Sequence, residues 1–305
     1  MRAVLIRAYG SNDVVRIEEV DRPEPKAGEI AVKVHTAGVN PIDWKIRSGA
    51  GQRLGMTLPI GMGGELVGTI EQLGAGVDDF QLGEAVFGMV RTGAFAEYAV
   101  ANAADMVRTP SNLDFVQAAA LPLAGSTAWQ AIFSEAGLVA AQRLLITNSS
   151  GGVGSLAVQF AKANGAHVTA VASARNEEFV RSLGADEFID YNNQPFEKVA
   201  QNIDVVFDTV GGETFQRAFQ TLKRGGFMVT VVAFPDGEAE RFGVSAVRSF
   251  TMPSAENLKA IKSLVEVGKV KPHVDAVFPF DQIKQALALS EGGRARGKIV
   301  LDIAH

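Results

Sequence analysis

The sequence contains no cysteine. Disulfide bonds, thiolate zinc sites and a cysteine nucleophile are therefore excluded, and a reducing compartment is favoured. No apolar run approaches the roughly 18 residues that span a bilayer, and the run within the N-terminal MRAVLIRAYG is too short for a signal peptide. We therefore expect a cytoplasmic protein that does not associate with membranes.

The chain also lacks any block of basic residues, and its formal net charge is −5. Nucleic acids and anionic membrane surfaces attract basic surfaces, so neither is an expected partner. With 305 residues, 47% of them hydrophobic, the chain has about the length of two domains and can bury a large core. We therefore expect a soluble two-domain protein whose partner is a small molecule.

The first 120 residues alternate between apolar and polar positions in short steps, as in EIAVKVHTAGV (29–39) and ELVGTIEQLGAGV (65–77). This alternation, interrupted by glycine-rich turns, predicts an antiparallel β domain. From about Ala124 the pattern instead predicts strands that alternate with helices. The strands are expected at 143–147, 166–172, 186–190, 203–210 and 226–234, and the helices at 126–136, 154–164, 176–183 and 256–267.

Strands that alternate with helices indicate right-handed crossovers and a doubly wound parallel sheet. The last segments, HVDAVFPF (273–280), a helix near 281–289 and GKIVLDI (297–303), suit a return to the first domain. We therefore predict an α/β protein with one domain formed by 1–122 and 268–305 and a second formed by 123–267.

A glycine-rich loop, SSGGVG (149–154), follows the predicted buried strand 143–147 and precedes an amphipathic helix. In a dinucleotide-binding turn, glycines let the backbone approach a pyrophosphate, whose charge rests on the free N–H groups at the helix start. The first glycine of the usual GxGxxG pattern is replaced by Ser149, so a tight turn that binds nothing is the alternative. The strand–loop–helix context favours binding, and we assign this role to Ser150, Gly151, Gly152, Val153 and Gly154.

The type of dinucleotide is indicated about 20 residues after the loop, where NAD-binding proteins carry an acidic residue that binds the ribose. No acidic residue occurs between Ser155 and Asn176; Ser173 and Arg175 occupy this region instead. A hydroxyl and a guanidinium can bind a 2′-phosphate that a carboxylate would repel. We therefore predict NADPH as the cofactor, although a solvated loop arginine is the alternative for Arg175.

Several segments, spread over nearly the whole chain, carry sequence patterns that have to be considered together. They are VKVHTAGVNPIDWKIRSG (32–49), LVGTIEQLGAGVDDFQLGEAVFG (66–88), GAFAEYAV (93–100), AAALPLAGSTAWQAI (118–132), SSGGVGSLAVQFAKANGAHVTA (149–170), RSLGADEFIDY (181–191), VVFDTVGG (205–212) and GKVKPHVD (268–275). Together they resemble the zinc-independent quinone oxidoreductase branch of the medium-chain dehydrogenase/reductases, which includes enone reductases. The resemblance implies a GroES-like substrate domain, a Rossmann domain and an active site in the cleft between them.

The resemblance also bears on metal binding. Zinc-dependent relatives carry a cysteine at the position of Asn40 and a histidine in a Gly-His-Glu run, which here reads Gly63, Gly64 and Glu65. Both ligands are absent from these positions, and we predict no metal site. Without a Lewis acid to lower the pKa of an alcohol, alcohol dehydrogenase activity is disfavoured.

The resemblance implies roles for several polar residues. Asn40 matches the family's asparagine beside the nicotinamide ribose, and Thr127 matches a position near the cofactor; an Asn-Pro turn and a helix-start hydroxyl are the alternatives. Lys45 lies in the segment that lines the family's cleft, where it would donate to the substrate oxygen, unless it is a surface lysine. We therefore predict Asn40 and Lys45 as the catalytic residues, whereas Asp43 is interpreted as a helix cap.

Further cofactor contacts are implied beyond the loop. Tyr191 matches a family position that stacks on or bonds the adenosine phosphate, and Val210 and Gly211 follow a parallel strand, where backbone lies along the cofactor. The family often has lysine at the place of Asn176, so the chain departs from the pattern there.

The function that follows is an NADPH-dependent, zinc-independent reductase of quinones or α,β-unsaturated carbonyls. Such acceptors are already electrophilic, so proximity and donors near their oxygen suffice. The alternatives are an NADPH-binding sensor or structural protein with little turnover and, less favoured, an alcohol dehydrogenase. The resemblance further implies a homodimer joined at the edges of the Rossmann sheets, with GFMVTVVAF (226–234) as the pairing strand.

Overall fold

The computed structural model describes residues 1–304 and divides the chain into two compact units. Unit 1 comprises Met1–Leu123, Pro253–Glu266 and the C-terminal segment from Pro272, and unit 2 comprises Ala124–Met252 and Val267–Lys271. The α/β fold class with a doubly wound sheet is confirmed. No helix within residues 1–304 combines the length and the apolar character that a membrane span requires.

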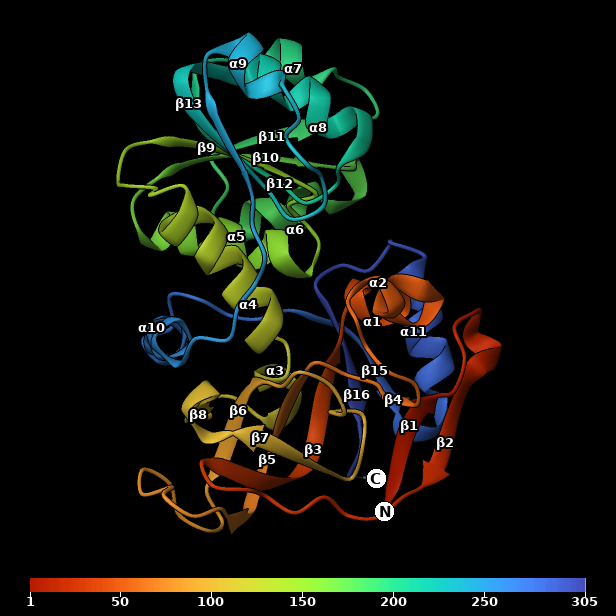
Figure 1. Cartoon of the computed structure of the whole chain (residues 1–305). Helices are drawn as coiled ribbons and strands as arrows, with labels where there is room; N and C mark the ends of the chain where they lie inside the picture. The colour runs from red at the N-terminus through yellow and green to blue at the C-terminus, as the bar shows by residue number, and fades with distance from the viewer. Residues whose placement is uncertain (305) are drawn as a thin grey trace. The chain divides into compact units, whose positions relative to one another are not determined.

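Unit 1 is built on two β-sheets (Figure 1). The smaller sheet has the order β2-β1-β4, and the larger one has the order β15-β16-β3-β5-β6-β8, with β7 also paired to β3. The strands are β1 (Arg2–Ile6), β2 (Val15–Glu19), β3 (Glu29–Val39), β4 (Ile60–Gly61), β5 (Glu65–Leu73), β6 (Ala85–Met89), β7 (Tyr98–Asn102), β8 (Met106–Arg108), β15 (Val274–Pro279) and β16 (Lys298–Asp302). Their inward faces, rich in β-branched residues, form one apolar core.

The helices of unit 1 are short, apart from two near the C-terminus. They are α1 (Pro41–Lys45), α2 (Gly51–Arg53), α3 (Phe115–Ala118), α10 (Ala255–Glu266) and α11 (Ile283–Glu291). Antiparallel pairing of β16 with β3 confirms that the C-terminal strands return to the first domain. Helix α10 also belongs to this unit: the side chain of Asn112 donates to the Val265 carbonyl at 2.9 Å.

Unit 2 contains a six-stranded sheet in which helices cover both faces. The sheet order is β11-β10-β9-β12-β13-β14, and every pairing is parallel. The strands are β9 (Arg143–Thr147), β10 (His167–Ala172), β11 (Glu187–Asp190), β12 (Ile203–Asp208), β13 (Leu222–Thr230) and β14 (Ser245–Arg248). Figure 1 shows α5 (Gly152–Ala163) and α6 (Glu177–Ser182) on one face, and α7 (Phe196–Val199), α8 (Gly212–Ala218) and α9 (Glu238–Phe242) on the other. Helix α4 (Pro122–Trp129) begins where the two units meet in sequence.

One prediction about this sheet is wrong. The segment 226–234 was expected to form an exposed edge, but β13 pairs with β14, which therefore forms the edge of the sheet. Strand β14 has the sequence SAVR and none of its residues is buried, so it lacks the apolar run from which a strand is recognised. The predicted domain limits, 1–122 with 268–305 for one domain and 123–267 for the other, remain a proposal. They differ from the unit boundaries mainly at 253–266, which belong to unit 1.

Candidate functional site

The glycine loop of unit 2 connects the end of β9 to the start of α5. Gly151 is the N-cap of this 12-residue helix, and the N–H of Ser155 donates to the Gly151 carbonyl at 2.9 Å. A Cβ at Gly154 would lie 2.3 Å from the carbonyl oxygen of Asn148 and 2.8 Å from the Cα of Ser149. Because both neighbours are backbone atoms, only glycine permits this close turn. The N–H groups of the first helical turn lie outside the intrahelical hydrogen-bond ladder, as an anion site requires.

A buried aspartate, which the sequence analysis did not single out, joins three strands near this loop. Asp208, at the end of β12, is fully buried and accepts hydrogen bonds from the hydroxyls of Thr147 and Thr230, each at 2.9 Å. It also accepts from the backbone N–H groups of Val210 and Gly211 at 3.1–3.2 Å. Asp208 thereby fixes the carboxyl ends of β9, β12 and β13, the edge at which doubly wound sheets bind ligands.

The residues predicted to recognise the 2′-phosphate lie after β10. Arg175 is exposed, and Ser173 is half-buried. The amide of Asn176 is buried and donates to the hydroxyls of Ser150, at 2.9 Å, and of Ser173, at 3.3 Å. Asn176 therefore links the glycine loop to the loop after β10, so this departure from the family pattern has a structural role.

Four further predicted cofactor residues also lie in unit 2. Tyr191 and Val210 are exposed, at 54% and 49%, whereas Gly211 has a left-handed backbone with φ of 80°. The hydroxyl of the buried Thr127 lies 2.7 Å from that of Thr251.

Asn40 in unit 1 belongs to a buried polar cluster. Its side-chain nitrogen donates to Glu65 at 2.6 Å and to the Gly38 carbonyl at 3.2 Å, and its side-chain oxygen accepts from the ammonium of Lys298. Lys298 also forms an ion pair with Glu65 at 2.8 Å; their side chains are 5% and 0% exposed. The second Glu65 oxygen accepts from the Leu123 N–H at 2.6 Å. The charges of Lys298 and Glu65 compensate each other, so removing either partner would leave an uncompensated buried charge.

Asp43 lies beside this cluster as the third residue of α1. One of its oxygens accepts from the Asn40 N–H at 2.7 Å, which agrees with the predicted capping role. The pKa of Asp43 is raised to about 7, mainly by burial and in addition by the nearby Glu65 carboxylate, which together outweigh the lowering effects of the Asn40 hydrogen bond and of Lys298.

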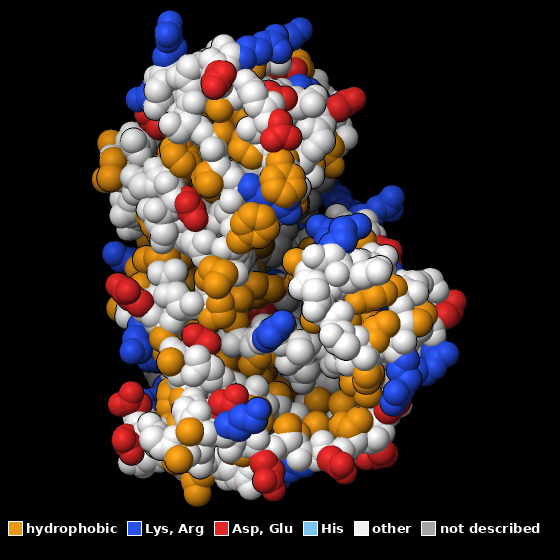
Figure 2. Space-filling view, viewed as in Figure 1, with side chains coloured by type: hydrophobic (Ala, Val, Ile, Leu, Met, Phe, Trp, Pro, Cys, Tyr) orange, Lys and Arg blue, Asp and Glu red, His pale blue; other side chains and the backbone are white. Residues whose placement is uncertain are grey.

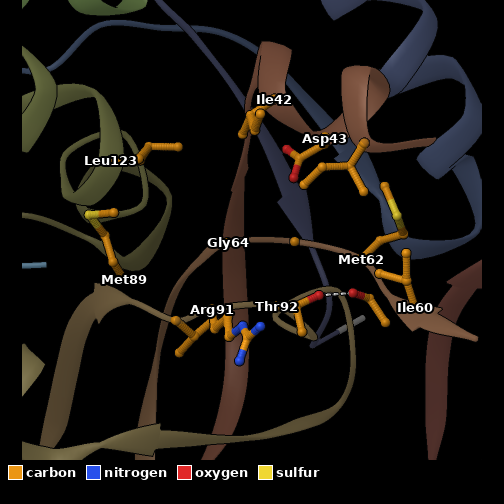
Figure 3. Close-up of a pocket in the computed structure, with 13 residues that line it drawn as sticks. Ile42, Asp43, Ile60, Met62, Gly64, Met89, Arg91, Thr92 and Leu123 are labelled. Atoms are coloured by element: carbon orange, nitrogen blue, oxygen red, sulfur yellow. Dashed lines mark hydrogen bonds between the residues drawn. The ribbon is translucent and has the colours of Figure 1, made fainter. Parts of the chain in front are cut away.

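A cavity of about 150 Å³ in unit 1 adjoins Asp43 (Figure 3). Its walls are mostly apolar, and the hydrophobic members are Ile42, Ile46, Ile60, Met62, Met89, Val90 and Leu123. Arg91 and Thr92 contribute polar groups, and Gly61, Gly63 and Gly64 contribute backbone. Lys45, predicted to contact the substrate, is not among the lining residues; its ammonium lies 5.6 Å from the ring centroid of Trp44.

These residues do not fit a zinc ion. Asn40 stands where a thiolate would be needed, Gly64 offers no side chain, and the Lys298 ammonium already contacts both Asn40 and Glu65. Within residues 1–304, no group of three or more histidine, aspartate or glutamate side chains is placed to hold a metal.

The family comparisons match two parts of the chain. Residues 26–111 match a family described as alcohol dehydrogenase GroES-like domain, and residues 183–301 match one described as zinc-binding dehydrogenase. Since the zinc ligands are absent, the second description holds for the fold and not for the metal.

Relatives of known name align with almost the whole chain. The NAD(P)H oxidoreductase RTN4IP1, mitochondrial, of Danio rerio is 34% identical, covering 99% of this chain and 91% of its own length. Two proteins of Arabidopsis thaliana are also 34% identical over 99% of this chain. One is a chloroplast envelope quinone oxidoreductase homolog, and the alignment covers 98% of its length. The other is a chloroplastic NADPH-dependent alkenal/one oxidoreductase, and the alignment covers 79% of its length. The quinone oxidoreductase structure from Coxiella burnetii superposes with a TM-score of 0.93 at 31% identity, covering 99% of both chains.

The expectation of a cytoplasmic protein is contradicted by the three relatives from Danio rerio and Arabidopsis thaliana, whose names place those proteins in mitochondria or chloroplasts. Absent cysteines and short apolar runs are compatible with several compartments, so they could not decide between them. The fold and the relatives agree on the family: the chain belongs to the medium-chain dehydrogenase/reductases, in the quinone oxidoreductase and enone reductase branch that lacks the zinc ligands.

Proposed function

We propose that the protein is an NADPH-dependent reductase of quinones or α,β-unsaturated carbonyls. The observation that carries the proposal is the glycine loop at the start of α5, where Gly154 allows a backbone turn that no other residue could form. The names of the relatives, a quinone oxidoreductase homolog and an NADPH-dependent alkenal/one oxidoreductase, support the substrate classes.

The loop Ser150–Gly154 would hold the pyrophosphate on the N–H groups of α5, and Val210 and Gly211 would line the nucleotide. Ser173, Arg175 and Tyr191 would bind the adenosine end, with its 2′-phosphate. Thr127 and Asn40 would lie near the nicotinamide. Lys45, which does not line the cavity of unit 1, would contact the substrate only outside that cavity.

When bound, NADPH supplies the hydride. The chain has to hold an acceptor and stabilise the charge that develops on its oxygen. The apolar cavity of unit 1 suits this task, since a cavity of about 150 Å³ accommodates one six-membered ring. Its hydrophobic walls would exclude water from the reacting carbon.

We further propose that the protein forms a homodimer through the open edge of β14. Exposed hydrophobic side chains lie near this strand: Phe250 and Met252, which follow it, are 59% and 64% exposed, and Phe234, whose ring lies against Arg248, is 62% exposed. Hydrophobic side chains are also visible on the surface of this unit in Figure 2.

The test is NADPH oxidation by the purified protein with a panel of quinones, enals and enones. We expect turnover with at least one of them, and an unchanged rate after prolonged EDTA treatment. Stoichiometric zinc whose removal abolishes the reaction would contradict the proposal. Tight NADPH binding without turnover across the panel would instead favour a nucleotide sensor.

A further inference from the structure

The cavity of unit 1 is lined by a single carboxyl group, that of Asp43. We propose that Asp43 is the proton donor to the reduced substrate in this cavity. This inference rests on the proposed function, because the proton is needed only once hydride has been transferred.

The geometry separates the two oxygens of Asp43. One is held by the Asn40 N–H, so the orientation of the carboxyl group is fixed by the first turn of α1. In Figure 3 the carboxyl group lies above Gly64 and points toward the side of the cavity on which Ile42 and Leu123 lie. Gly64 leaves this space open: the nearest heavy atom to an added Cβ would be the Val90 carbonyl oxygen, at 3.7 Å.

The charges around Asp43 favour its protonated form. Glu65 from β5 and Lys298 from β16 face it from the packed strands and compensate each other, so an ionised Asp43 would leave one uncompensated buried charge. On the α11 side, Arg47 is paired with Glu291 at 3.0 Å. Arg91 is the remaining charged group of the cavity lining. With a pKa near 7, Asp43 can release and regain a proton at neutral pH, as a general acid must.

The proposed step balances as follows. Hydride addition turns a quinone into a hydroquinone monoanion, or an enone into an enolate. The O–H bond of Asp43 breaks, its proton forms a new O–H or C–H bond on that anion, and the electron pair stays on Asp43 as carboxylate. A proton from solvent then restores the acid, so each cycle consumes one hydride and one proton.

Asp43→Asn tests the proposal because its side-chain oxygen still accepts from the Asn40 N–H while its amide supplies no acidic proton. We expect kcat to fall by about 100-fold, with the dissociation constant for NADPH unchanged. The wild-type kcat/KM should decrease as the pH rises through about 7, because the raised pKa leaves Asp43 protonated only below that value, and the variant should lose this dependence. Asp236→Asn, which changes an exposed aspartate of unit 2, is the matched control and should behave as wild type.

An Asp43→Asn variant with wild-type kcat and a wild-type pH profile would overturn the proposal. If the variant does not fold, the pH profile of the wild-type enzyme tests the proposal instead. A wild-type kcat/KM that does not change between about pH 6 and 8 would also overturn it. Failure of the proposed function itself is distinguishable, since the wild-type protein would then reduce no acceptor at any pH.

Discussion

At the scale of single residues, Lys298 is a buried cation beside the two positions at which zinc ligands are absent, Asn40 and Gly64. Its ammonium contacts the side chains of Asn40 and of Glu65, the neighbour of Gly64 in sequence. Removing one partner of a buried ion pair costs about 3–5 kcal/mol, because the other charge is left uncompensated. Lys298 thus compensates the charge of Glu65 in the place of a metal ion.

This arrangement leads to a prediction about zinc. In an Asn40→Cys, Gly64→His variant, a thiolate and an imidazole would stand beside Glu65, but the Lys298 ammonium should still exclude a dication. Adding Lys298→Met should permit zinc binding, up to about one ion per chain. The measurement is zinc content after loading and dialysis, together with the zinc-induced change in Tm. Lys298→Met alone is the control; stoichiometric zinc in the double variant with Lys298 intact would disprove this role.

Arg175 carries the prediction of cofactor preference. A charge-assisted contact to a phosphate contributes about 1.5–3 kcal/mol, reduced here because Arg175 is exposed. Arg175→Ala should therefore weaken NADPH binding by roughly 5- to 100-fold and leave NADH binding almost unchanged. Dissociation constants for both nucleotides at low and higher ionic strength measure this, since salt should reduce the advantage.

Arg181→Ala is the matched control for this experiment. Arg181 lies on the following helix, α6, where it pairs with Glu177 at 2.8 Å, and its loss should affect neither nucleotide. Equal weakening of NADPH and NADH by Arg175→Ala would show that Arg175 is only a surface residue.

At the scale of elements, the glycine loop depends on one close backbone contact. In Gly154→Ala the new methyl group would meet Asn148 and Ser149 backbone atoms at 2.3 and 2.8 Å, so the loop has to shift. We expect a loss of about 1–3 kcal/mol in the free energy of unfolding and a weaker NADPH complex. Denaturant titration and nucleotide titration measure the two effects. Ser155→Ala is the control on the same helix, because its hydroxyl bonds only the Gly152 carbonyl, at 3.3 Å; equal behaviour of both variants would contradict the expectation.

The elements also show how far the sequence predicts the structure. The strand 143–147 was predicted with the observed bounds because its centre is apolar, and the alternating segment 29–39, an example of the predicted β pattern, coincides with β3. The buried clusters could not be predicted in this way: Lys298 and Glu65 are 233 residues apart, and Asp208 and Thr147 are 61 apart. Such contacts depend on strand order and register, which local periodicity does not specify. The acid at the end of the buried strand in VVFDTVGG was the only local sign of the Asp208 site.

At the scale of the whole molecule, the proposed dimer would form at the open edge of the parallel sheet, strand β14. Strand β14 uses one side of its backbone to pair with β13, as in the hydrogen bond from the Ser249 N–H to the Thr230 carbonyl at 2.8 Å. Because successive residues of a strand point their N–H groups to opposite sides, those of Ala246 and Arg248 face the open edge. Arg248 also lies over the rings of Phe234 and Phe250, at 4.0 and 4.8 Å, which holds two exposed aromatic rings beside this edge.

Ala246→Pro should therefore separate the proposed dimer without disturbing the sheet. Proline removes an N–H that faces away from β13 and is tolerated on edge strands, so the β13–β14 pairing should remain. We expect the wild-type protein to sediment as a dimer at micromolar concentration and the variant as a monomer with an unchanged circular dichroism spectrum. Ala246→Ser keeps the N–H and should remain dimeric. A wild-type monomer would contradict the dimer itself, whereas a dimeric Ala246→Pro variant would show that the copies associate through another surface, because a continuous sheet across β14 cannot form when this donor is missing.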